Sequence, residues 1–538
     1  MARQSKVTLH PSFEIGEISP RLFSGYLEPF KFGGVHGMVY NPKHPTADEQ
    51  GFRQDVIDSL KDAGLRAVRL PGGNFVSCWD WKDSIGPMEQ RKVRLDLAQR
   101  WTYPNDMGHD EYLQWAEKVG FEPLYTINLG TGDINDAIKI VEYTNHPGGT
   151  YWSDLRKQYG HEKPYGVKVW YLGNEMDGPW QLGSWEKNPR GYGILAHEVS
   201  KAIKFIDGSI ETVACVSSSP FQAHYPQWDL EALQECYETV DYISLHHYHA
   251  AKGADIPSLL AGSEMFEDYI RTEIALCDFV KTKLRSTKTM MLSFDEWGSM
   301  CEPLQELHYG RNGNVLVDEH YKFDPNQQHP TIDPSDYKGR FNFRGPRVSE
   351  MTSALASASV MLTLMRHADR IKIGCATGGI NMLMRADGEH VWKPIAYYPY
   401  EDIILYGNGM SLQPEIESDT YDVPGYATQD AHQYDDHNNI KFIESAAAYN
   451  DEKGILTVYV INRDWENDSE LTLDVSGFKG YEFVEHQEMF SDDFEISNTY
   501  ENPEALLPAV NKETKCEDGK VCALVKKLSW NVFRFKKA

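Results

Sequence analysis

The chain has 538 residues, which is more than one hydrophobic core usually organises, so we expect a large domain and at least one smaller domain. Hydrophobic residues make up 41% and charged residues 25%, as in soluble globular proteins, which excludes disordered, fibrous and membrane classes. The formal net charge of −27 repels phosphate backbones and anionic membranes, so we expect no nucleic-acid partner and no membrane partner.

The N-terminal segment MARQSKVTLHPSFEIGEI has no apolar core of a signal peptide, and no later run approaches the ~20 apolar residues of a membrane span. We therefore expect a cytoplasmic protein. The eight cysteines show no close CxxC pairs, and free thiols are expected. Only Cys516 and Cys522 are near enough in sequence for a local pairing, and a reducing cytosol argues against it.

Residues 1–18 contain two strand-like runs, Lys6–Leu9 and Phe13–Ile15, which we expect to complete a β-sandwich formed by the C-terminal part of the chain. From residue 19 to 400, short apolar runs alternate with longer amphipathic segments, as in repeated βα units. The predicted strands are Leu22–Leu27, Ala67–Leu70, Pro123–Leu129, Lys168–Leu172, Glu211–Val216, Tyr242–Leu245, Thr289–Phe294 and Ile371–Cys375. The predicted helices include Asp48–Ala63, Asp110–Val119, Tyr192–Ile206, Phe266–Leu284 and Ser349–His367. Eight such units predict an α/β fold with a closed (β/α)8 TIM barrel.

Residues 305–347 interrupt this pattern with a polar stretch rich in Pro, Gly, Asp and Asn. The segment follows the seventh predicted strand, so it would lie on the catalytic face as a lid or subsite wall. An oligomer contact or a decorative insertion is an equal alternative.

Residues 401–538 change to short alternating runs broken by polar turns, which predict an antiparallel, jelly-roll-like β-sandwich. The clearest runs are Ala446–Tyr449, Ile455–Ile461, Glu470–Val475 and Val532–Phe535.

Two glutamates follow predicted barrel strands, where catalytic groups of such barrels lie. Glu175 follows the fourth strand in WYLGNEMDGPW, and Glu296 follows the seventh in SFDEW. A single glutamate at a strand end is more often a helix cap or an ion-pair partner. Strands four and seven lie across the barrel mouth, however, and a pair of carboxylic acids is what glycoside hydrolysis requires.

Residues beside these glutamates suit a sugar site. Asn174 offers an amide to a sugar hydroxyl, and Trp180 and Trp297 offer apolar faces to a sugar ring, although each tryptophan can equally be packing. His246, His247 and His249 invite a zinc interpretation, but alternation in a strand divides them between two faces and no carboxylate or cysteine nearby completes a ligand set. We therefore predict no metal. Cys78 is a nucleophile only if a base lies beside it, and a pocket wall is as plausible.

The segment Tyr165–Gly183 closely resembles the acid/base motif of glycoside hydrolase family 51, the α-L-arabinofuranosidases. Further stretches resemble this family in the same order along the barrel: RLPGGNFVS at 69–77, IGP at 85–87, RLDLA at 94–98, NLGT at 128–131, NHPGGT at 145–150, WSDLR at 152–156 and SFDEW at 293–297.

The resemblance implies a (β/α)8 barrel with a β-sandwich, anomeric retention, no cofactor, no metal and frequently a homohexamer. It implies that Glu175 is the acid/base and Glu296 the nucleophile. The substrate-binding residues that it implies are Glu28, Asn74, Asn174, Arg69 beside the nucleophile, and Tyr248. The positive charge of Arg69 would keep Glu296 ionised.

The chain departs from the family pattern around the sugar. Gln99 replaces a tryptophan, Gly298, Ser299 and Met300 replace an asparagine and aromatic residues, Gly378 aligns with a glutamine that binds arabinose, and Pro29 replaces a histidine. These departures concern the substrate more than the reaction, because a site that loses a hydrogen-bonding group can favour another ring substituent.

The leading hypothesis is a retaining exo-glycosidase that removes terminal α-L-arabinofuranosyl residues from oligosaccharides. The alternatives are a glycosidase for a galactofuranoside, a D-arabinofuranoside, a β-xyloside or a β-glucan, and a carbohydrate-binding protein without catalysis.

Overall fold

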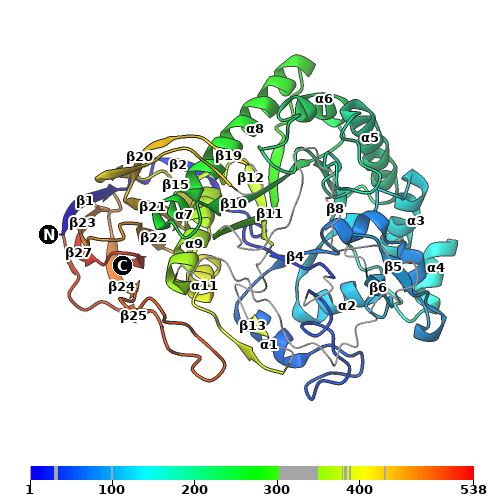
Figure 1. Ribbon diagram of the computed structural model, residues 1–538, viewed down its shortest axis with the longest axis horizontal. Coiled ribbons are helices and arrows are strands. Elements are labelled where there is room, and N and C mark those ends of the chain that lie inside the picture. Colours follow the sequence, from blue (N-terminus) through cyan, green and yellow to red (C-terminus); the bar gives the residue numbers. More distant parts are fainter. Residues whose placement is uncertain are drawn as a thin grey trace.

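The computed structural model describes residues 2–29, 34–98, 101–301, 349–377, 380, 385–386, 389–428 and 432–538. A barrel surrounded by helices lies on the right of Figure 1, and a body of β-sheets that holds both termini lies on the left. The predicted insertion at 305–347 falls outside the described residues. Across the described parts of the chain, we find no helix with the length and apolar character needed to cross a membrane.

A parallel sheet of eight strands forms the barrel, in the order β12-β11-β10-β9-β8-β7-β4-β3. Its strands are β3 (Gly25–Tyr26), β4 (Ala67–Leu70), β7 (Glu122–Ile127), β8 (Val169–Leu172), β9 (Glu211–Cys215), β10 (Tyr242–Ala251), β11 (Met291–Cys301) and β12 (Ile371–Ala376). The first and last strands meet where the Ser24 amide donates to the Gly374 carbonyl at 2.7 Å. The predicted barrel is therefore confirmed.

Helices surround the strands, as expected for βα units. They are α1 (Gln54–Asp62), α2 (His109–Val119), α3 (Ile134–Asn145), α4 (Tyr151–Gln158), α5 (Pro189–Ile206), α6 (Gln227–Cys236), α7 (Ile256–Leu260), α8 (Gly262–Leu284), α9 (Glu350–Arg366) and α11 (Tyr397–Tyr406). The helix predicted from Asp48 begins only at Gln54, because the Asp48 carboxylate accepts bonds from the amides of Gln50 and Phe52 and holds a turn there.

Short elements lie outside the three large sheets. Three 3-10 helices follow β4: η1 (Asn74–Cys78), η2 (Trp81–Ser84) and η3 (Met88–Gln90). Four small antiparallel pairs are β5 (Arg94–Asp96) with β6 (Trp101–Tyr103), β13 (Arg385–Ala386) with β14 (Val391–Trp392), β17 (Thr420–Val423) with β20 (His437–Lys441), and β18 (Tyr426–Ala427) with β19 (Gln433–Tyr434).

Two further sheets pack as a sandwich. The seven-stranded sheet runs β2 (Glu14–Glu17), β15 (Met410–Leu412), β21 (Ile443–Asn450), β22 (Ile455–Asn462), β28 (Ser529–Lys537), β24 (Tyr481–Met489) and β25 (Ala509–Val510). The five-stranded sheet runs β16 (Glu415–Glu417), β1 (Arg3–Thr8), β23 (Ser469–Asp474), β27 (Lys520–Val525) and β26 (Lys515–Glu517). Alternating apolar residues of both sheets, such as Val7, Val458 and Leu473, share one core.

The N-terminal strands belong to this sandwich. β1 lies between β16 and β23, and β2 pairs with β15. The β1–β23 pair is parallel within otherwise antiparallel sheets, because β1 arrives from the far end of the chain and no hairpin connects it to β23.

Helix α9 lies between the barrel and the sandwich (Figure 1) and is buried on all sides rather than along one stripe. It packs against β11 and β12 on one side and against β21 and β22 on the other. Helix α11 runs through residue 400, where the sequence predicts the boundary between the domains, and its Asp402 accepts a bond from the Trp530 indole of β28 at 2.8 Å.

Candidate active site

The two predicted catalytic glutamates lie together at the barrel mouth. Glu175 follows shortly after β8 ends, with a left-handed backbone (φ 45°) that non-glycine residues rarely adopt. Glu296 lies within β11, since β11 continues to Cys301 instead of ending at Phe294. One oxygen of each carboxylate and one nitrogen of His246 all lie within 4.8 Å of one another.

Glu296 is held as an anion. The Arg69 guanidinium donates to its Oε1 at 2.6 Å, and the Tyr248 hydroxyl donates to its Oε2 at 2.7 Å. Burial alone would raise the pKa of Glu296, but the positive charges of His246 and Arg69 outweigh it and lower the pKa below its ordinary value.

The pKa of Glu175 shifts in the opposite direction, above its ordinary value. The Trp180 indole donates to its Oε2 at 2.7 Å, and His246 Nδ1 lies 3.0 Å from its Oε1. Burial, together with the negative charge of Glu296, raises the pKa of Glu175 although both hydrogen bonds oppose the shift. The pKa values of the two carboxyl groups therefore shift in opposite directions. Such a difference suits Glu175 to act as an acid and Glu296 to act as a nucleophile.

His246 provides the central positive charge of the site. Its Nε2 lies 3.2 Å from Asp295 Oδ2, and its Nδ1 faces Glu175 and Glu296. Burial lowers the pKa of His246, but the surrounding carboxylates Glu296, Asp295 and Glu175 raise it to about 10. The ring is therefore an imidazolium at neutral pH.

Asp295 also faces the site, although it directly precedes Glu296 in the same strand. The register of β11 against β12 shifts between Phe294 and Trp297, so strict alternation is interrupted. Asp295 Oδ2 lies 3.1 Å from Arg69 Nε and accepts a bond from the Ser244 hydroxyl at 3.0 Å.

Glu28 lies buried beside the loop that follows β4. The Tyr26 hydroxyl donates to its Oε2 at 2.8 Å, and the Phe75 amide donates to its Oε1 at 3.3 Å. Burial first, and then the charge of Glu296, raises the pKa of Glu28 to about 8. Gly73 (φ 69°) permits this approach, because a Cβ at Gly73 would lie 2.0 Å from the carboxylate.

Asn174 and Asn74 connect the two sides of the mouth. Arg69 Nη2 donates to Asn174 Oδ1 at 2.7 Å, and Asn174 Nδ2 donates to Asn74 Oδ1 at 3.2 Å. Gln181 also hydrogen-bonds Asn74 and lies 3.4 Å from Glu175 Oε2.

The two tryptophans predicted to contact sugar are placed differently. Trp180 is half-buried and bonded to Glu175. Trp297 is 1% exposed within the main hydrophobic core and pairs in register with His247, on the face of β11 opposite to Glu296. The structure therefore does not bring Trp297 to the mouth.

The expectation that no carboxylate lies near the histidines was wrong for His246, because Glu175, Glu296 and Asp295 surround it. His247 packs instead among Phe221, Phe266 and Tyr269. The strands β8 and β11 bring these carboxylates to β10 from distant parts of the sequence, which spacing within β10 does not show.

Several residues in which the chain departs from the family pattern can be located. Gly298 and Ser299 lie in β11, and Pro29 is buried after β3. Gln99, Gly378 and the side chain of Met300 fall outside the described residues. Cys78 is partly buried, and burial followed by the nearby Asp96 raises its thiol pKa, so it is not an activated nucleophile.

Comparisons with known proteins cover nearly the whole chain. Residues 59–271 match the α-L-arabinofuranosidase 1 domain, and residues 337–529 match the α-L-arabinofuranosidase C-terminal domain. A protein of Acetivibrio thermocellus named intracellular exo-α-(1→5)-L-arabinofuranosidase is 37% identical, over 99% of this chain and 100% of that protein. The chain belongs to the α-L-arabinofuranosidases of glycoside hydrolase family 51.

Two further relatives support the same family. A Bacillus subtilis protein named intracellular exo-α-(1→5)-L-arabinofuranosidase 1 is 36% identical over 99% of both chains. The solved structure of a family 51 α-L-arabinofuranosidase from Bifidobacterium longum superposes with a TM-score of 0.84 at 30% identity, and the match covers 99% of this chain and 100% of the other. The sequence-based assignment to this family is therefore confirmed.

Sequence reasoning missed four contributors to this family 51 site: the charge of His246, and the side chains of Asp295, Gln181 and Tyr26. Asp295 stands in the SFDEW motif, so its position was a signal, but regular alternation would have turned it away from Glu296. Gln181 follows Trp180 directly, within the segment that resembles the acid/base motif.

Proposed function

We propose that the protein hydrolyses terminal α-L-arabinofuranosyl residues of oligosaccharides with retention of anomeric configuration. The observation that carries this proposal is the pair of close carboxyl groups whose pKa values shift in opposite directions, upward for Glu175 and downward for Glu296. Retaining enzymes hold their two carboxyl groups about 5–5.5 Å apart, whereas inverting enzymes need roughly 6.5–9.5 Å. The contact within 4.8 Å supports retention.

In the first step, the Glu175 carboxylic acid donates its proton to the glycosidic oxygen while a Glu296 carboxylate oxygen attacks the anomeric carbon. The bond from that carbon to the leaving oxygen breaks, and a glycosyl ester of Glu296 forms. Arg69 and Tyr248, which bond the two oxygens of Glu296, hold the nucleophile in place and ionised.

In the second step, the Glu175 carboxylate removes a proton from water, and the water oxygen attacks the anomeric carbon. The ester bond breaks, Glu296 regains its negative charge, and Glu175 regains its proton. His246 Nδ1 lies 3.0 Å from Glu175 and 3.8 Å from Glu296, so its positive charge balances the negative charge that alternates between the two glutamates.

Substitution separates the two roles. With a nitrophenyl α-L-arabinofuranoside, Glu175→Ala slows hydrolysis of the glycosyl ester of Glu296 and so lowers kcat by about 10²–10⁴-fold. Glu296→Ala removes turnover. Added azide gives the α-arabinofuranosyl azide with Glu175→Ala, because azide attacks the glycosyl ester, and gives the β-azide with Glu296→Ala. Proton NMR distinguishes these products. A β-configured first product from the wild-type enzyme would show inversion and reject the mechanism.

The identity of the furanose that is released is the second part of the proposal. The chain departs from the family pattern at Gln99, Gly298 and Gly378, so a galactofuranoside or D-arabinofuranoside is the second candidate. A panel of nitrophenyl glycosides decides between them, and we expect the highest kcat/KM with the α-L-arabinofuranoside. Binding without hydrolysis on every glycoside would instead indicate a carbohydrate-binding protein.

We also propose that the enzyme acts inside the cell on imported oligosaccharides, supported by the word "intracellular" in the names of the relatives. We further propose that the protein assembles as a homo-oligomer, which light scattering of the purified protein tests. A hexamer is the expected form, as for the family.

A further inference from the structure

Thr377 directly follows β12 and is tied by its backbone to the strand that carries Glu296. Its amide donates to the Trp297 carbonyl at 3.0 Å, and Ala376, the last residue of β12, pairs in register with Trp297. The Thr377 side chain is half-buried. These backbone contacts fix Thr377 beside the neighbour of the predicted nucleophile.

The Thr377 side chain contacts the tyrosine that bonds the nucleophile. Thr377 Oγ1 lies 2.7 Å from the Tyr248 hydroxyl oxygen, and that hydroxyl donates to Glu296 Oε2 at 2.7 Å. Because β11 lies between β10 and β12 in the sheet, Tyr248 and Thr377 reach each other from opposite sides of the strand that carries Glu296. Two consecutive hydrogen bonds therefore lead from Thr377 to the nucleophile.

The direction of these two bonds follows from the number of protons. Ionised Glu296 only accepts, so the single phenolic proton of Tyr248 lies in the bond to Glu296. Burial, and then the negative charge of Glu296, raises the pKa of Tyr248 above its ordinary value, so the phenol keeps this proton. The proton in the bond between Tyr248 and Thr377 must then come from Thr377.

A donor at Thr377 selects one orientation of the Tyr248 hydroxyl. A phenolic O–H rotates to suit its neighbours, and a donor on one side of the oxygen directs the phenolic proton to the other side, toward Glu296. Consecutive hydrogen bonds also polarise one another, so a hydroxyl that accepts a bond becomes a stronger donor. Loss of the Thr377 hydroxyl therefore weakens the bond from Tyr248 to Glu296.

Other groups also act on the pKa of Glu296, and a substitution at Thr377 leaves their charges unchanged. The positive charges of His246 and Arg69 lower this pKa. The titratable groups around Glu296 are Arg69 of β4, His246 and Tyr248 of β10, Asp295 of β11, Cys375 of β12, Tyr26 of β3, Glu28 after β3 and Glu175 after β8.

We infer that Thr377 is a positioning residue for the reaction, because its hydroxyl donates to Tyr248 and so directs the Tyr248 proton to Glu296. Thr377 acts through Tyr248 and makes no contact with the reacting atoms in this role. The part of Glu296 as the nucleophile rests on the proposed function.

Thr377→Val keeps the shape of the side chain and removes its hydroxyl. The bond from Tyr248 then weakens and the pKa of Glu296 rises. The acid limb of kcat/KM against pH, measured with a nitrophenyl α-L-arabinofuranoside, should move to higher pH by about 0.4–1 unit, the equivalent of one ordinary hydrogen bond. The alkaline limb should stay in place, because the substitution changes no charge. Thr377→Ser, which keeps the hydroxyl, should have the wild-type acid limb.

A double substitution shows whether Thr377 acts through Tyr248. In Tyr248→Phe the phenolic hydroxyl is already absent, so the addition of Thr377→Val should cause no further shift of the acid limb. The same shift in both backgrounds would contradict the inference, and so would a wild-type acid limb in the single variant Thr377→Val.

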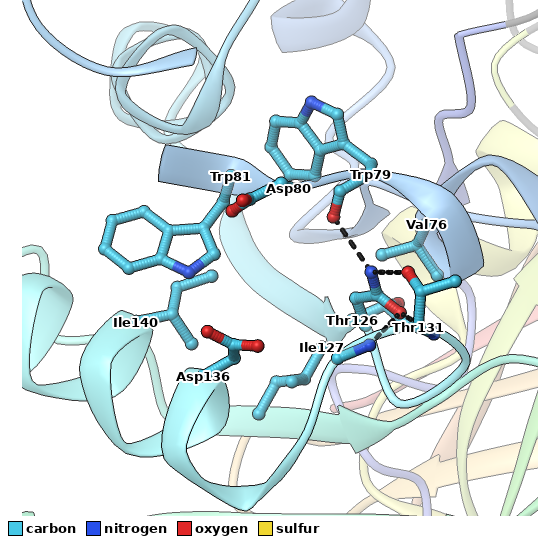
Figure 2. A pocket seen from close by; sticks show the side chains of 11 residues that line it. Val76, Trp79, Asp80, Trp81, Thr126, Ile127, Thr131, Asp136 and Ile140 are labelled. Carbon is cyan, nitrogen blue, oxygen red and sulfur yellow. Dashed lines mark hydrogen bonds between the residues drawn. The ribbon is translucent and has the colours of Figure 1, made fainter. Parts of the chain in front are cut away.

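Thr131→Val is a matched control. The Thr131 hydroxyl donates to the Ser77 carbonyl at 3.0 Å and lies 2.9 Å from Asn128 Nδ2, so this variant also loses hydrogen bonds of a threonine. Figure 2 shows Thr131 at the edge of a cavity of about 140 Å³. The described residues that line this cavity include neither Glu296 nor Tyr248. Both pH limbs should keep their wild-type positions, and a shift equal to that of Thr377→Val would overturn the inference.

A direct titration makes the test independent of activity. Carbon-13 NMR of labelled glutamate carboxyl groups, with Glu296→Gln to identify the Glu296 signal, measures the pKa of Glu296 in the wild type and in Thr377→Val. We expect a higher pKa in the variant, and equal values would reject the inference. A wild-type protein that does not hydrolyse the nitrophenyl arabinofuranoside would reject only the proposed function. If Thr377→Val does not fold, Thr377→Ala removes the same hydroxyl.

Discussion

At the residue scale, the charge of His246 lowers the pKa of both glutamates. Burial raises the pKa of each carboxyl, and the imidazolium lowers both. Activity requires ionised Glu296 and protonated Glu175, so the acid limb of the pH profile follows the pKa of Glu296 and the alkaline limb follows that of Glu175.

We predict that His246→Gln moves both limbs to higher pH and lowers kcat. Glutamine keeps a hydrogen-bond donor but removes the positive charge, so both carboxyl pKa values rise. The dependence of kcat/KM on pH for a nitrophenyl arabinofuranoside measures the shift. Limbs that stay in place would show that His246 is neutral in the enzyme.

Trp180→Phe is the matched comparison, because Trp180 contacts Glu175, and no bond between Trp180 and Glu296 occurs among the described residues. Burial raises the pKa of Glu175, and the Trp180 hydrogen bond opposes that rise, so its loss raises this pKa further. Only the alkaline limb should then move to higher pH. A shift of the acid limb as well would contradict this assignment.

At the element scale, the lengths of β10 and β11 shape the site. Both strands continue well past the ends predicted from their apolar runs, Leu245 and Phe294, because polar residues such as His246 and Asp295 find partners at the mouth. From the sequence, such polar residues indicate the end of a strand, because the residues that they contact lie on other strands and are not visible in the local pattern.

A second feature at this scale is the contact of α11 with β28. Asp402 of α11 is buried, and burial raises its pKa to about 7 although the Trp530 hydrogen bond opposes the shift. A carboxyl whose pKa is raised in the folded state stabilises the fold below its unfolded pKa near 4, and this stabilisation is lost as the pH rises through 7.

We therefore predict that Asp402→Asn, which keeps a carbonyl to accept the Trp530 bond, gains stability relative to the wild type as the pH rises from 4 to 8. The difference in Tm between the two proteins, measured at several pH values, checks this. A difference that does not change with pH would show that Asp402 does not titrate in this range.

At the scale of the whole molecule, the barrel and the sandwich share one continuous core. Ile461 of β22 and Val532 of β28 belong to the same hydrophobic cluster as the barrel residues Leu292 and Leu364. Such a core couples the unfolding of the two parts, although the candidate active-site residues that the structure describes lie on the barrel.

We predict that Ile461→Ala, in the sandwich, destabilises the protein by about 2–5 kcal/mol and lowers the temperature at which activity is lost. Loss of activity and loss of circular dichroism signal should shift by the same amount. An unchanged temperature of activity loss, with an earlier change in circular dichroism, would show that the barrel unfolds independently.

The sequence alone predicted the barrel, its eight strands, the sandwich and the family, because hydrophobic periodicity and ordered motifs are local properties of the chain. It also predicted Glu175 and Glu296 as the catalytic pair, which stays a prediction until it is measured. The division of the chain at residues 18 and 400 likewise stays a prediction, and α11 continues through residue 400.

Only the tertiary structure decided what surrounds those glutamates. It brought His246 into contact with Glu175, Glu296 and Asp295, and it turned Trp297 into the core. The physical reason is that pKa shifts and binding cavities arise from charges and surfaces brought together by distant strands, whereas a sequence pattern records only what neighbouring residues share.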